Sequence, residues 1–461
     1  MTPKSADVII CGAGICGISA AYHLAVKQGV EQVILVDERD PMSFTSDKST
    51  ECYRNWWPGP GDTMVRLMNR SIDLLEELAL ESNNYFSLNR RGYAFVTADP
   101  AKVTQYERIA REIGKLGAGP LRIHRGSPTD PVYIPSPSEG FQDLPTGADL
   151  LLNKKLIKQT FPFISDDIAA ILHVRRCGWL SAQQLGVYLL QQGRANGVEL
   201  VKGRLEEVSL DDGSVRSVFI RTGQGRLELQ TDKFVIAAGP FQKQVAALIG
   251  VDLPVYNELH PKVAFRDNMH VIPPDAPLMI WDDPLHLYWN DHELEELAAY
   301  EDTSSLLEKF PAGVHFRPEG SGEGSYLLGL WTYDIKEQEP VPDPVFDQEY
   351  PEIILRGLVR MVPGLKTYLN KMSKPSIDGG YYCKTRENRP LICPLPVKGT
   401  YLFGAISGFG IMAAMAGGEL LAKHVTGDEL PDYADAFLLS RYEDPEYQEL
   451  LKDWESTSGQ L

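Results

Sequence analysis

The sequence predicts an α/β protein in which a domain with a parallel sheet is interleaved with an α+β domain built on an antiparallel sheet. Near the N-terminus, the apolar run at residues 8–11 leads into a glycine turn, a helix and a second apolar run that ends on Asp37. Another strand, glycine turn and helix follow at residues 401–424. Between them, residues 255–370 are rich in aromatic side chains and contain short alternating strands, a pattern typical of an antiparallel sheet.

The N-terminal turn has the glycine spacing of a Rossmann-like dinucleotide site. Gly12 permits the tight turn, Gly14 lets the backbone approach a pyrophosphate, and Gly17 lets the helix pack closely on the strand. The helix N-terminus offers N–H groups and a positive dipole end to phosphates. Asp37 can accept hydrogen bonds from a ribose diol. We therefore expect a dinucleotide to contact Gly12, Gly14, Ile15, Cys16, Gly17, Asp37 and Glu38.

The length of 461 residues favours two domains, and 43% hydrophobic with 23% charged residues is typical of a globular protein. The net charge of −18 argues against nucleic acid and against an anionic membrane as partners, because both require a basic face. No apolar run is long enough for a membrane-spanning helix, and the first strand leaves no room for a signal peptide, so a cytoplasmic protein is expected. The six cysteines lack metal-site spacing, which favours reduced thiols.

The segment at residues 45–59 is polar, then aromatic, and is broken by Pro and Gly. It follows the nucleotide-binding strand and carries hydroxyl groups and an arginine. Because loops on rigid scaffolds often carry function, we expect Ser49, Thr50 and Arg54 to lie near the cofactor. A helix with apolar residues at helical spacing is predicted over residues 62–79.

The middle of the chain contains elements of both domains. A strand at 92–96 and a Pro/Ser-rich stretch at 127–140 are assigned to the second domain, and an amphipathic helix is predicted over 182–196. The strands expected after that helix are 198–201, 215–220, 226–229 and 234–236. The last one leads into Ala238 and Gly239, small residues that let a ligand or another backbone come close.

The aromatic region supplies the candidates for a substrate pocket. Strands at 313–317 and 326–330 can place one sheet face over a ligand, although aromatic strands are often simply core. His260, His315 and Tyr288 are weak catalytic candidates, because a lone histidine in such a region is often structural. The residues after about 435 are acidic and rich in tyrosine, which predicts a surface tail.

In this order, the segments resemble the flavin-dependent oxidoreductases of the D-amino acid oxidase family, which includes monomeric sarcosine oxidase and dimethylglycine dehydrogenase. The resemblance implies that Asp37 holds the adenosine ribose of FAD. It matches the Thr385–Ile392 stretch to the family's Thr-x-Asp-x-x-Pro-x-Ile pattern, and the Ser407–Gly410 turn to the backbone beside the isoalloxazine ring. There the helix dipole stabilises negative charge on the reduced ring. The residues implied at this end are Gly408, Phe409, Gly410, Ile411 and Met412.

Two departures from the family pattern affect the expected site. Sarcosine oxidases place a lysine after the glycine turn to hold the substrate carboxylate, and Met412 stands at that position here. The candidates for another carboxylate anchor are Arg317, Lys262 and Arg386. Cys383 is too close to Thr385 to match the flavin-linking cysteine of that subgroup, and residues 45–59 contain no histidine for the alternative linkage. We therefore expect non-covalent FAD.

The activity implied by the resemblance is hydride transfer to FAD from the carbon next to the nitrogen of a small secondary or N-methyl amine or a D-amino acid. Oxygen or an electron carrier would accept the electrons, and no nucleic acid or membrane partner is expected. Three alternatives remain open: a 2-hydroxy acid or polyol-phosphate dehydrogenase on the same fold, a nicotinamide-dependent dehydrogenase, and a non-catalytic flavoprotein assembly factor.

The expected FAD-binding domain is discontinuous and comprises residues 1–85, 150–255 and 375–435. The substrate domain comprises residues 86–149 and 256–374. Residues 436–461 form the predicted C-terminal tail.

Overall fold

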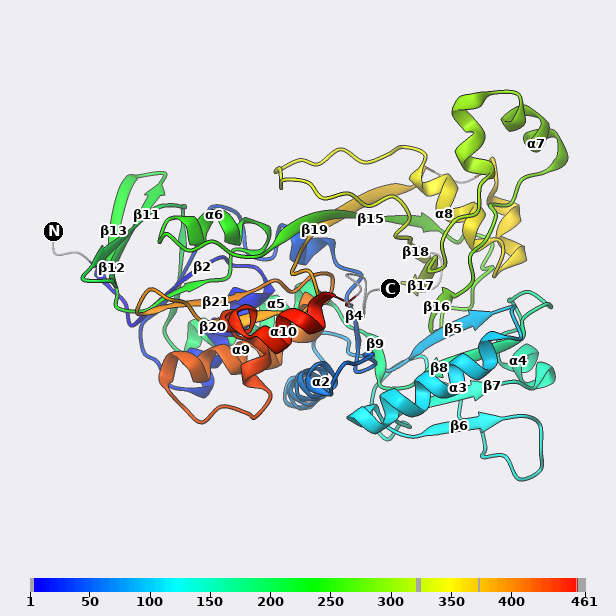
Figure 1. Cartoon of the computed structure of the whole chain (residues 1–461), viewed down its shortest axis with the longest axis horizontal. Helices are drawn as coiled ribbons and strands as arrows, with labels where there is room; N and C mark the ends of the chain where they lie inside the picture. Colours follow the sequence, from blue (N-terminus) through cyan, green and yellow to red (C-terminus); the bar gives the residue numbers. More distant parts are fainter. Residues whose placement is uncertain (1–3, 321–324, 372–373, 453, 455–461) are drawn as a thin grey trace.

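The structure, a computed structural model, describes residues 4–320, 325–371, 374–452 and 454. Over these residues the strands form four sheets, and the molecule has two lobes that lie side by side (Figure 1). One lobe is built on a six-stranded, mostly parallel sheet, and the other on a nine-stranded mixed sheet. The predicted α/β fold with an interleaved second domain is confirmed.

The six-stranded sheet has the strand order β10-β3-β2-β14-β21-β20. Its neighbours are parallel except for β20, which runs antiparallel to β21. Strands β2, β3 and β14 are buried almost throughout, as expected for parallel strands covered on both faces. The strands are β2 (Val8–Cys11), β3 (Val33–Asp37), β10 (Val198–Lys202), β14 (Phe234–Ile236), β20 (Leu391–Pro394) and β21 (Thr400–Gly404).

Helices cover one face of this sheet, where α1 packs against α5 and α9, and α9 also packs against α2. These helices are α1 (Ile15–Tyr22), continued by a π-helical turn at His23–Lys27, α2 (Thr63–Glu81), α5 (Ala182–Ala195) and α9 (Gly410–Thr426). A four-stranded sheet and α6 share a core with the other face. They are β1 (Lys4–Ser5), β13 (Gly225–Gln230), β12 (Ser214–Thr222), β11 (Arg204–Asp211) and α6 (Gln242–Ala247).

The nine-stranded sheet has the order β19-β15-β18-β17-β16-β5-β8-β7-β6. Neighbouring strands are antiparallel except in the β16–β5 and β6–β7 pairs. The strands are β5 (Tyr93–Thr97), β6 (Leu121–His124), β7 (Ala148–Leu151), β8 (Ala170–Val174), β15 (Tyr256–Arg266), β16 (Leu278–Trp281), β17 (His315–Glu319), β18 (Tyr326–Leu330) and β19 (Ser376–Lys384). The helices of this lobe are α3 (Lys102–Ile113), α4 (Lys154–Thr160), α7 (Asp291–Ala298) and α8 (Tyr350–Leu358).

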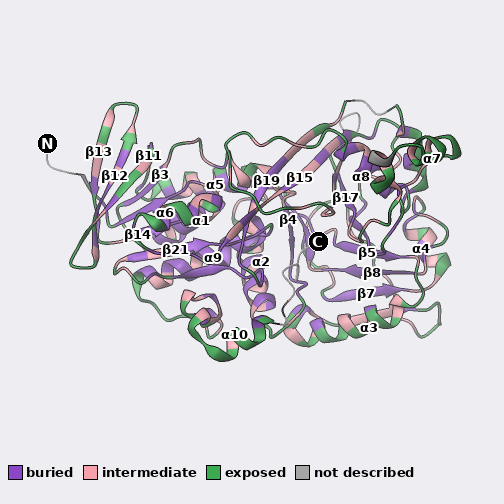
Figure 2. Cartoon of the chain, turned by 45° about the horizontal axis from the view of Figure 1, so that its top comes forward, coloured by how far each residue is buried: buried purple, intermediate pink, exposed green. Residues whose placement is uncertain are grey.

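A two-stranded ribbon lies between the lobes in Figure 1 and consists of β4 (Cys52–Arg54) and β9 (Cys177–Trp179). Short helical turns complete the described chain, at Thr45–Lys48, Gly114–Ala118, Gly239–Phe241, Glu301–Leu307, Pro363–Tyr368, Ala434–Phe437 and Leu439–Glu443. Figure 2 shows the buried residues concentrated in the strands of both lobes, while α7 is largely exposed.

The strands at the lobe boundaries differ from the sequence-based division. The sequence-based division places residues from 150 onward in the FAD-binding domain, yet β7 and β8 pair with each other, and β8 pairs with β5, inside the nine-stranded sheet. Strand β19, assigned to the same domain, pairs along its length with β15. Apolar strands of this kind suit either sheet, so their pairing partner is not contained in the local sequence.

The described part of the C-terminal segment packs onto the first lobe and is not the surface tail that its composition predicted, and residues 453 and 455–461 of that prediction lie outside the described residues. Helix α10 (Pro445–Lys452) follows two short turns in which Phe437 and Arg441 are buried. Arg441 donates to the buried Glu387 Oε1 from Nε at 3.0 Å and from Nη2 at 2.6 Å. The hydroxyls of Tyr442 and Tyr447 donate to the same oxygen. These donors compensate a charge that would be costly to bury alone.

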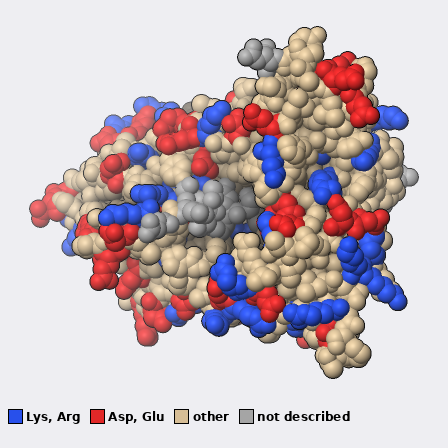
Figure 3. Space-filling view, turned by 45° about the vertical axis from the view of Figure 1, so that its right-hand side comes forward, with Lys and Arg blue, Asp and Glu red and all other residues tan. Residues whose placement is uncertain are grey.

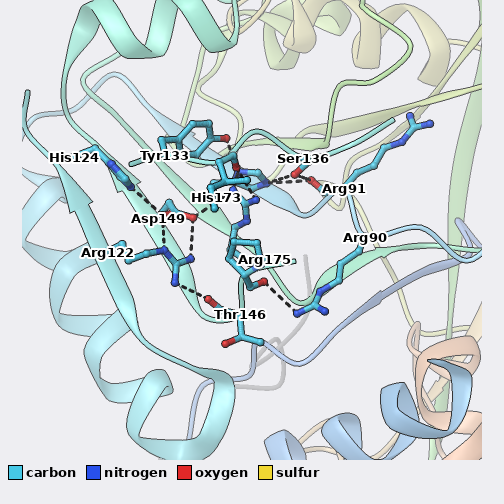
Figure 4. Close-up of polar contacts among 12 residues, drawn as sticks. Arg90, Arg91, Arg122, His124, Tyr133, Ser136, Thr146, Asp149, His173 and Arg175 are labelled. Atoms are coloured by element: carbon cyan, nitrogen blue, oxygen red, sulfur yellow. Dashed lines mark hydrogen bonds and ion pairs between the residues drawn. The ribbon is translucent and has the colours of Figure 1, made fainter. Parts of the chain in front are cut away.

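A buried polar network fixes the long loop between β6 and β7 to the nine-stranded sheet (Figure 4). His173 Nδ1 lies 2.8 Å from the Tyr133 hydroxyl and 3.2 Å from Arg175 Nη1. Its Nε2 lies 3.0 Å from the Arg91 carbonyl oxygen. These contacts suit a neutral ring that donates from Nε2 and accepts at Nδ1. Burial lowers the pKa of His173 to about 3.

Acidification is expected to destabilise the fold, starting near the pKa of an unfolded histidine, about 6.5. Burial lowers the pKa values of His23 and His315 to about 4, in addition to that of His173. Between about pH 6.5 and 4 the unfolded chain therefore binds protons that the native state does not bind, so the free energy of unfolding falls as the pH falls. Each histidine contributes at most about 1.4 kcal/mol per pH unit, measurable by urea unfolding across this range.

A matched pair of variants isolates the contribution of one buried ring. His173→Gln should make the free energy of unfolding less dependent on pH. His292→Gln is the matched exposed variant, since the His292 side chain is 78% exposed. The same pH slope in His173→Gln as in the wild type would contradict this assignment.

Candidate functional site

The N-terminal glycine turn leaves no space for a side chain at two of its glycines. Gly12 has a φ of +114°, and a Cβ there would lie 2.2 Å from the Ala237 carbonyl oxygen. A Cβ on Gly17 would lie 1.9 Å from the Gly12 carbonyl oxygen. A Cβ on Gly14 would meet Ser46 Oγ at 3.2 Å, a contact that a small movement can relieve. Gly12 and Gly17 therefore serve packing. Gly12 and Gly14 both line a cavity, and of the two only Gly14 has room for a side chain.

Asp37 ends β3 beside this turn. Its Oδ2 accepts a hydrogen bond from the Ala13 N–H at 2.8 Å, and its Oδ1 accepts one from the Arg39 N–H at 2.9 Å. A carboxylate offers about four acceptor positions, so Asp37 can fix the turn and still accept from a ligand hydroxyl. Ser46 Oγ accepts from the Ile15 N–H at 3.0 Å, which ties the segment after β3 to the N-terminus of α1.

A cavity of about 860 Å³ extends from this turn to the second glycine turn, at the start of α9. Its volume is in the range of pockets that hold small molecules and cofactors. The sequence-predicted residues that line it are Gly12, Gly14, Ile15, Cys16, Asp37, Glu38, Ser49, Ala238, Gly239, Gly408, Gly410 and Ile411. Gly17 lies outside the wall, because its open face is filled by the Gly12 backbone.

A second cavity, of about 60 Å³, adjoins the first one and shares Tyr382, Ser407 and Gly408 with it. Four residues expected at the cofactor line this small cavity and not the large one: Thr50, Arg54, Phe409 and Met412. His260 and His315 line it as well. The small cavity thus brings residues of β4, β15 and β17 to the N-terminus of α9.

Arg54 places a cation in the wall of the small cavity. Its side chain is 5% exposed, and the guanidinium lies 5.0 Å from the centre of the Trp57 ring. Burial lowers the pKa of Arg54, which remains charged near neutral pH because arginine starts from a very high value. His315 adds no charge there, since burial lowers its pKa to about 4.

His260 is held by a carboxylate on its own strand. Its Nε2 lies 2.9 Å from Glu258 Oε2, and the same oxygen accepts from Lys384 Nζ at 3.0 Å. Burial acts to raise the pKa of Glu258, but the hydrogen bonds from His260 and Lys384 bring it below its usual value. The His260 ring stacks on Tyr382, with 3.8 Å between ring centres and 11° between planes. Burial lowers the pKa of His260 despite the nearby Glu258 carboxylate.

The other predicted substrate residues line neither cavity: Tyr288, Arg317, Lys262 and Arg386. Arg317 is buried in an ion pair with Glu51, 3.1 Å away. Lys262 donates to a backbone carbonyl of the 45–50 segment at 3.0 Å. Arg386 is exposed, and Tyr288 packs on the second lobe with Lys366 Nζ 4.1 Å from its ring centre. The function proposed below therefore makes no use of them as direct substrate contacts.

Sequence analysis missed Tyr382, which forms the wall between the two cavities. A Cβ on Gly408 would lie 2.2 Å from the Tyr382 ring, so the glycine turn and this ring are in direct contact. The register of β15 on β19 places Glu258 opposite Tyr382. The side chains of Glu258, Lys384 and Tyr382 come together only through this strand pairing. No local sequence motif indicates that they are neighbours.

Cys383 lines the large cavity, and its sulfur accepts from Gln242 Nε2 at 2.7 Å. Burial raises the pKa of this thiol to about 12. The reactive form of cysteine is the thiolate, so Cys383 is poorly suited to form a covalent bond.

Together, the fold, the glycine turn and the long cavity define a dinucleotide-binding α/β protein. The chain belongs to the FAD dependent oxidoreductase family, whose profile matches residues 7–424. The cofactor is therefore FAD, as the resemblance implied, and the nicotinamide-dependent alternative is set aside. None of the described helices is both long and apolar enough to cross a membrane.

Known relatives cover most of the chain at low identity. It is 21% identical over 442 residues to human mitochondrial dimethylglycine dehydrogenase, a match that covers 92% of this chain and 43% of that protein. The chain thus spans less than half the length of this relative. Sarcosine oxidase subunit beta of Arthrobacter sp. is 21% identical, with 95% of this chain and 92% of that one covered. The solved L-proline dehydrogenase of P. horikoshii has a TM-score of 0.71 at 19% identity, covering 96% and 98% of the two chains, which shows a shared fold.

The residues present fit FAD. The large cavity joins Asp37 and Gly14, suited to a ribose and a pyrophosphate, with the α9 N-terminus, suited to an electron-rich ring. A side chain at Gly14 would enter the cavity with little strain inside the protein. A substitution there can therefore weaken FAD binding while the protein still folds.

Gly14→Val should yield a folded protein that binds FAD at least about 100-fold more weakly, a loss of about 2.7 kcal/mol, because the valine side chain occupies the pyrophosphate position. Flavin absorbance and equilibrium titration measure the affinity, and the melting temperature reports folding. Gly223→Val is the control, since a Cβ there has no heavy atom within 4 Å. Wild-type affinity in a folded Gly14→Val protein would overturn the assignment.

FAD should be released into solution when the protein is precipitated with acid, because the Cys383 thiol is not ionised. Yellow colour in the supernatant and an unmodified protein mass check this expectation. Flavin that stays with the pellet and adds its mass to a Cys383 peptide would contradict it.

Proposed function

We propose that this protein oxidises the C–N bond of a small amino acid or N-methyl amine, with FAD as the electron acceptor. The observation that carries the proposal is a buried cation and a carboxylate-held histidine, Arg54 and His260, on one small cavity beside the Gly408 turn. Relatives named for dimethylglycine and sarcosine support an amine over a 2-hydroxy acid as substrate.

Arg54 is proposed to hold the substrate carboxylate. A guanidinium presents parallel N–H donors that match a carboxylate, and in a buried site this pairing also fixes orientation. The role that a lysine plays in the sarcosine oxidases is thereby assigned to β4 and not to the Met412 position on α9. Binding of the carboxylate orients the substrate so that the C–H bond on the carbon next to the nitrogen faces Gly408, in the wall that the two cavities share.

His260 is proposed to take the proton of the substrate ammonium. Because its Nε2–H donates to the Glu258 carboxylate, Nδ1 is the acceptor nitrogen of the neutral ring. The lowered pKa of His260 keeps the ring neutral near pH 7, and Glu258 stabilises the charge that it gains. Bound FAD supplies a hydride acceptor, and the chain supplies orientation, a dry cavity and a place for this proton. Oxygen or an electron carrier is the proposed final acceptor.

Anaerobic addition of sarcosine or a D-amino acid should bleach the flavin bands of the purified protein. In Arg54→Met, kcat/KM for such carboxylates should fall at least about 100-fold, because the carboxylate loses its buried partner, while FAD affinity stays unchanged. Arg111→Met is the matched control, since that side chain is 57% exposed on α3.

Flavin bands that persist with every amine but bleach with 2-hydroxy acids or polyol phosphates would overturn the proposed reaction. Equal kcat/KM in Arg54→Met and the wild type would leave the reaction in place and remove Arg54 as the anchor.

A further inference from the structure

The size of the small cavity limits what can bind in it. Its volume is about 60 Å³. A buried water needs roughly 10–15 Å³ on such a measure, so the cavity holds roughly four to six water-sized groups. That is the size of glycine or its N-methyl derivative. An amino acid with a branched side chain needs a larger space.

Much of the apolar wall is fixed in place. Leu278, Trp331 and Phe409 are at most 4% exposed and belong to the two hydrophobic cores. The Trp331 indole donates to the Ala312 carbonyl oxygen at 3.4 Å, and a Cβ on Gly357 would lie 2.6 Å from its ring. Side chains packed this closely cannot move aside without strain, so the cavity does not expand easily at these positions.

Met412 is the adjustable part of this wall. It lies in the first turn of α9, is 5% exposed, and lines the small cavity next to Phe409. Met412 belongs to the same hydrophobic core as Phe409, but its side chain is unbranched and adapts to irregular spaces. Shortening this one residue is therefore the simplest way to enlarge the cavity.

The charge of the wall matches one carboxylate. Arg54 is the cation there, and His315 stays neutral because burial lowers its pKa to about 4. His260 has its Nε2 on Glu258, a carboxylate that would repel a second acidic group. Met412 adds no charge at the position where a lysine would have added one. A substrate with two carboxylates would leave one of them buried without a partner.

We propose that the substrate is a glycine-sized monocarboxylic amino acid, with or without an N-methyl group, and that Met412 sets its upper size limit. This inference rests on the proposed function, because it takes the small cavity as the substrate site. It deepens that proposal by naming the substrate class and the residue that selects it.

The first test uses the wild-type holoenzyme under anaerobic conditions with sarcosine, N-methylalanine and N-methylleucine. The kcat/KM for flavin bleaching should fall along this series, by at least about 100-fold from the first to the last. Equal values for sarcosine and N-methylleucine would overturn the size limit.

Met412→Ala should reduce that preference to less than about 10-fold, because its smaller side chain makes room for a branched substrate. Met412→Leu keeps the volume and should keep the size preference. A Met412→Ala protein with wild-type FAD content and melting temperature but an unchanged preference would remove Met412 as the determinant.

Unreactive carboxylates provide a readout that needs neither a variant nor turnover. Acetate should perturb the spectrum of the oxidised flavin, while 4-methylpentanoate and succinate should bind at least about 100-fold more weakly. Equal affinities would overturn the size and charge limits. If no amine bleaches the flavin but acetate binds selectively, the oxidation fails and the limits stand. If amines of every size bleach it, the oxidation stands and the size limit fails.

Discussion

The two cavities meet at a hydrogen bond that joins the lobes, from the Ser407 N–H to the Cys383 carbonyl oxygen at 2.9 Å. It joins the glycine turn before α9 to β19 of the nine-stranded sheet. Ser407 adopts a φ of +47°, which is unfavourable for a residue with a side chain and persists where the surroundings impose it. The result is direct contact between Gly408 and Tyr382, and the two cavities meet there.

Support for that contact comes from outside the family match. The matched region ends at residue 424, yet Arg441 reaches back to Glu387 in the turn that follows β19. Arg389 of the same turn donates to the Pro60 carbonyl oxygen at 2.6 Å, near the segment that carries Arg54. The buried Arg441–Glu387 pair thus ties the C-terminal segment to the turn between β19 and β20. Figure 3 shows that charged side chains also spread over the outer surface, where they contribute much less.

The sequence predicted the parts of the molecule that are encoded locally. Gly12, Gly14, Gly17 and Asp37 are spaced by the backbone geometry of one turn and one strand, and helices such as α2 and α5 follow from apolar periodicity. The small cavity is not encoded locally. It requires the register of β15 on β19, and the same lack of local information assigned β8 to the wrong lobe. Arg54 was predicted near the cofactor, and the structure places it on the small cavity, because a loop position does not tell which cavity a side chain enters.

Strand β14 lies between β2 and β21 in the six-stranded sheet, so neighbours in space come from the start, the middle and the end of the chain. During synthesis, the N-terminal glycine turn leaves the ribosome long before Gly408 exists. The cofactor cavity can therefore form only when nearly all of the described chain has emerged. Until then, strands such as β2 lack a neighbouring strand on one side, and their backbone N–H and C=O groups stay unpaired there. Such a protein is exposed to aggregation and to chaperones while it is being made. A supply of FAD can stabilise only the finished chain.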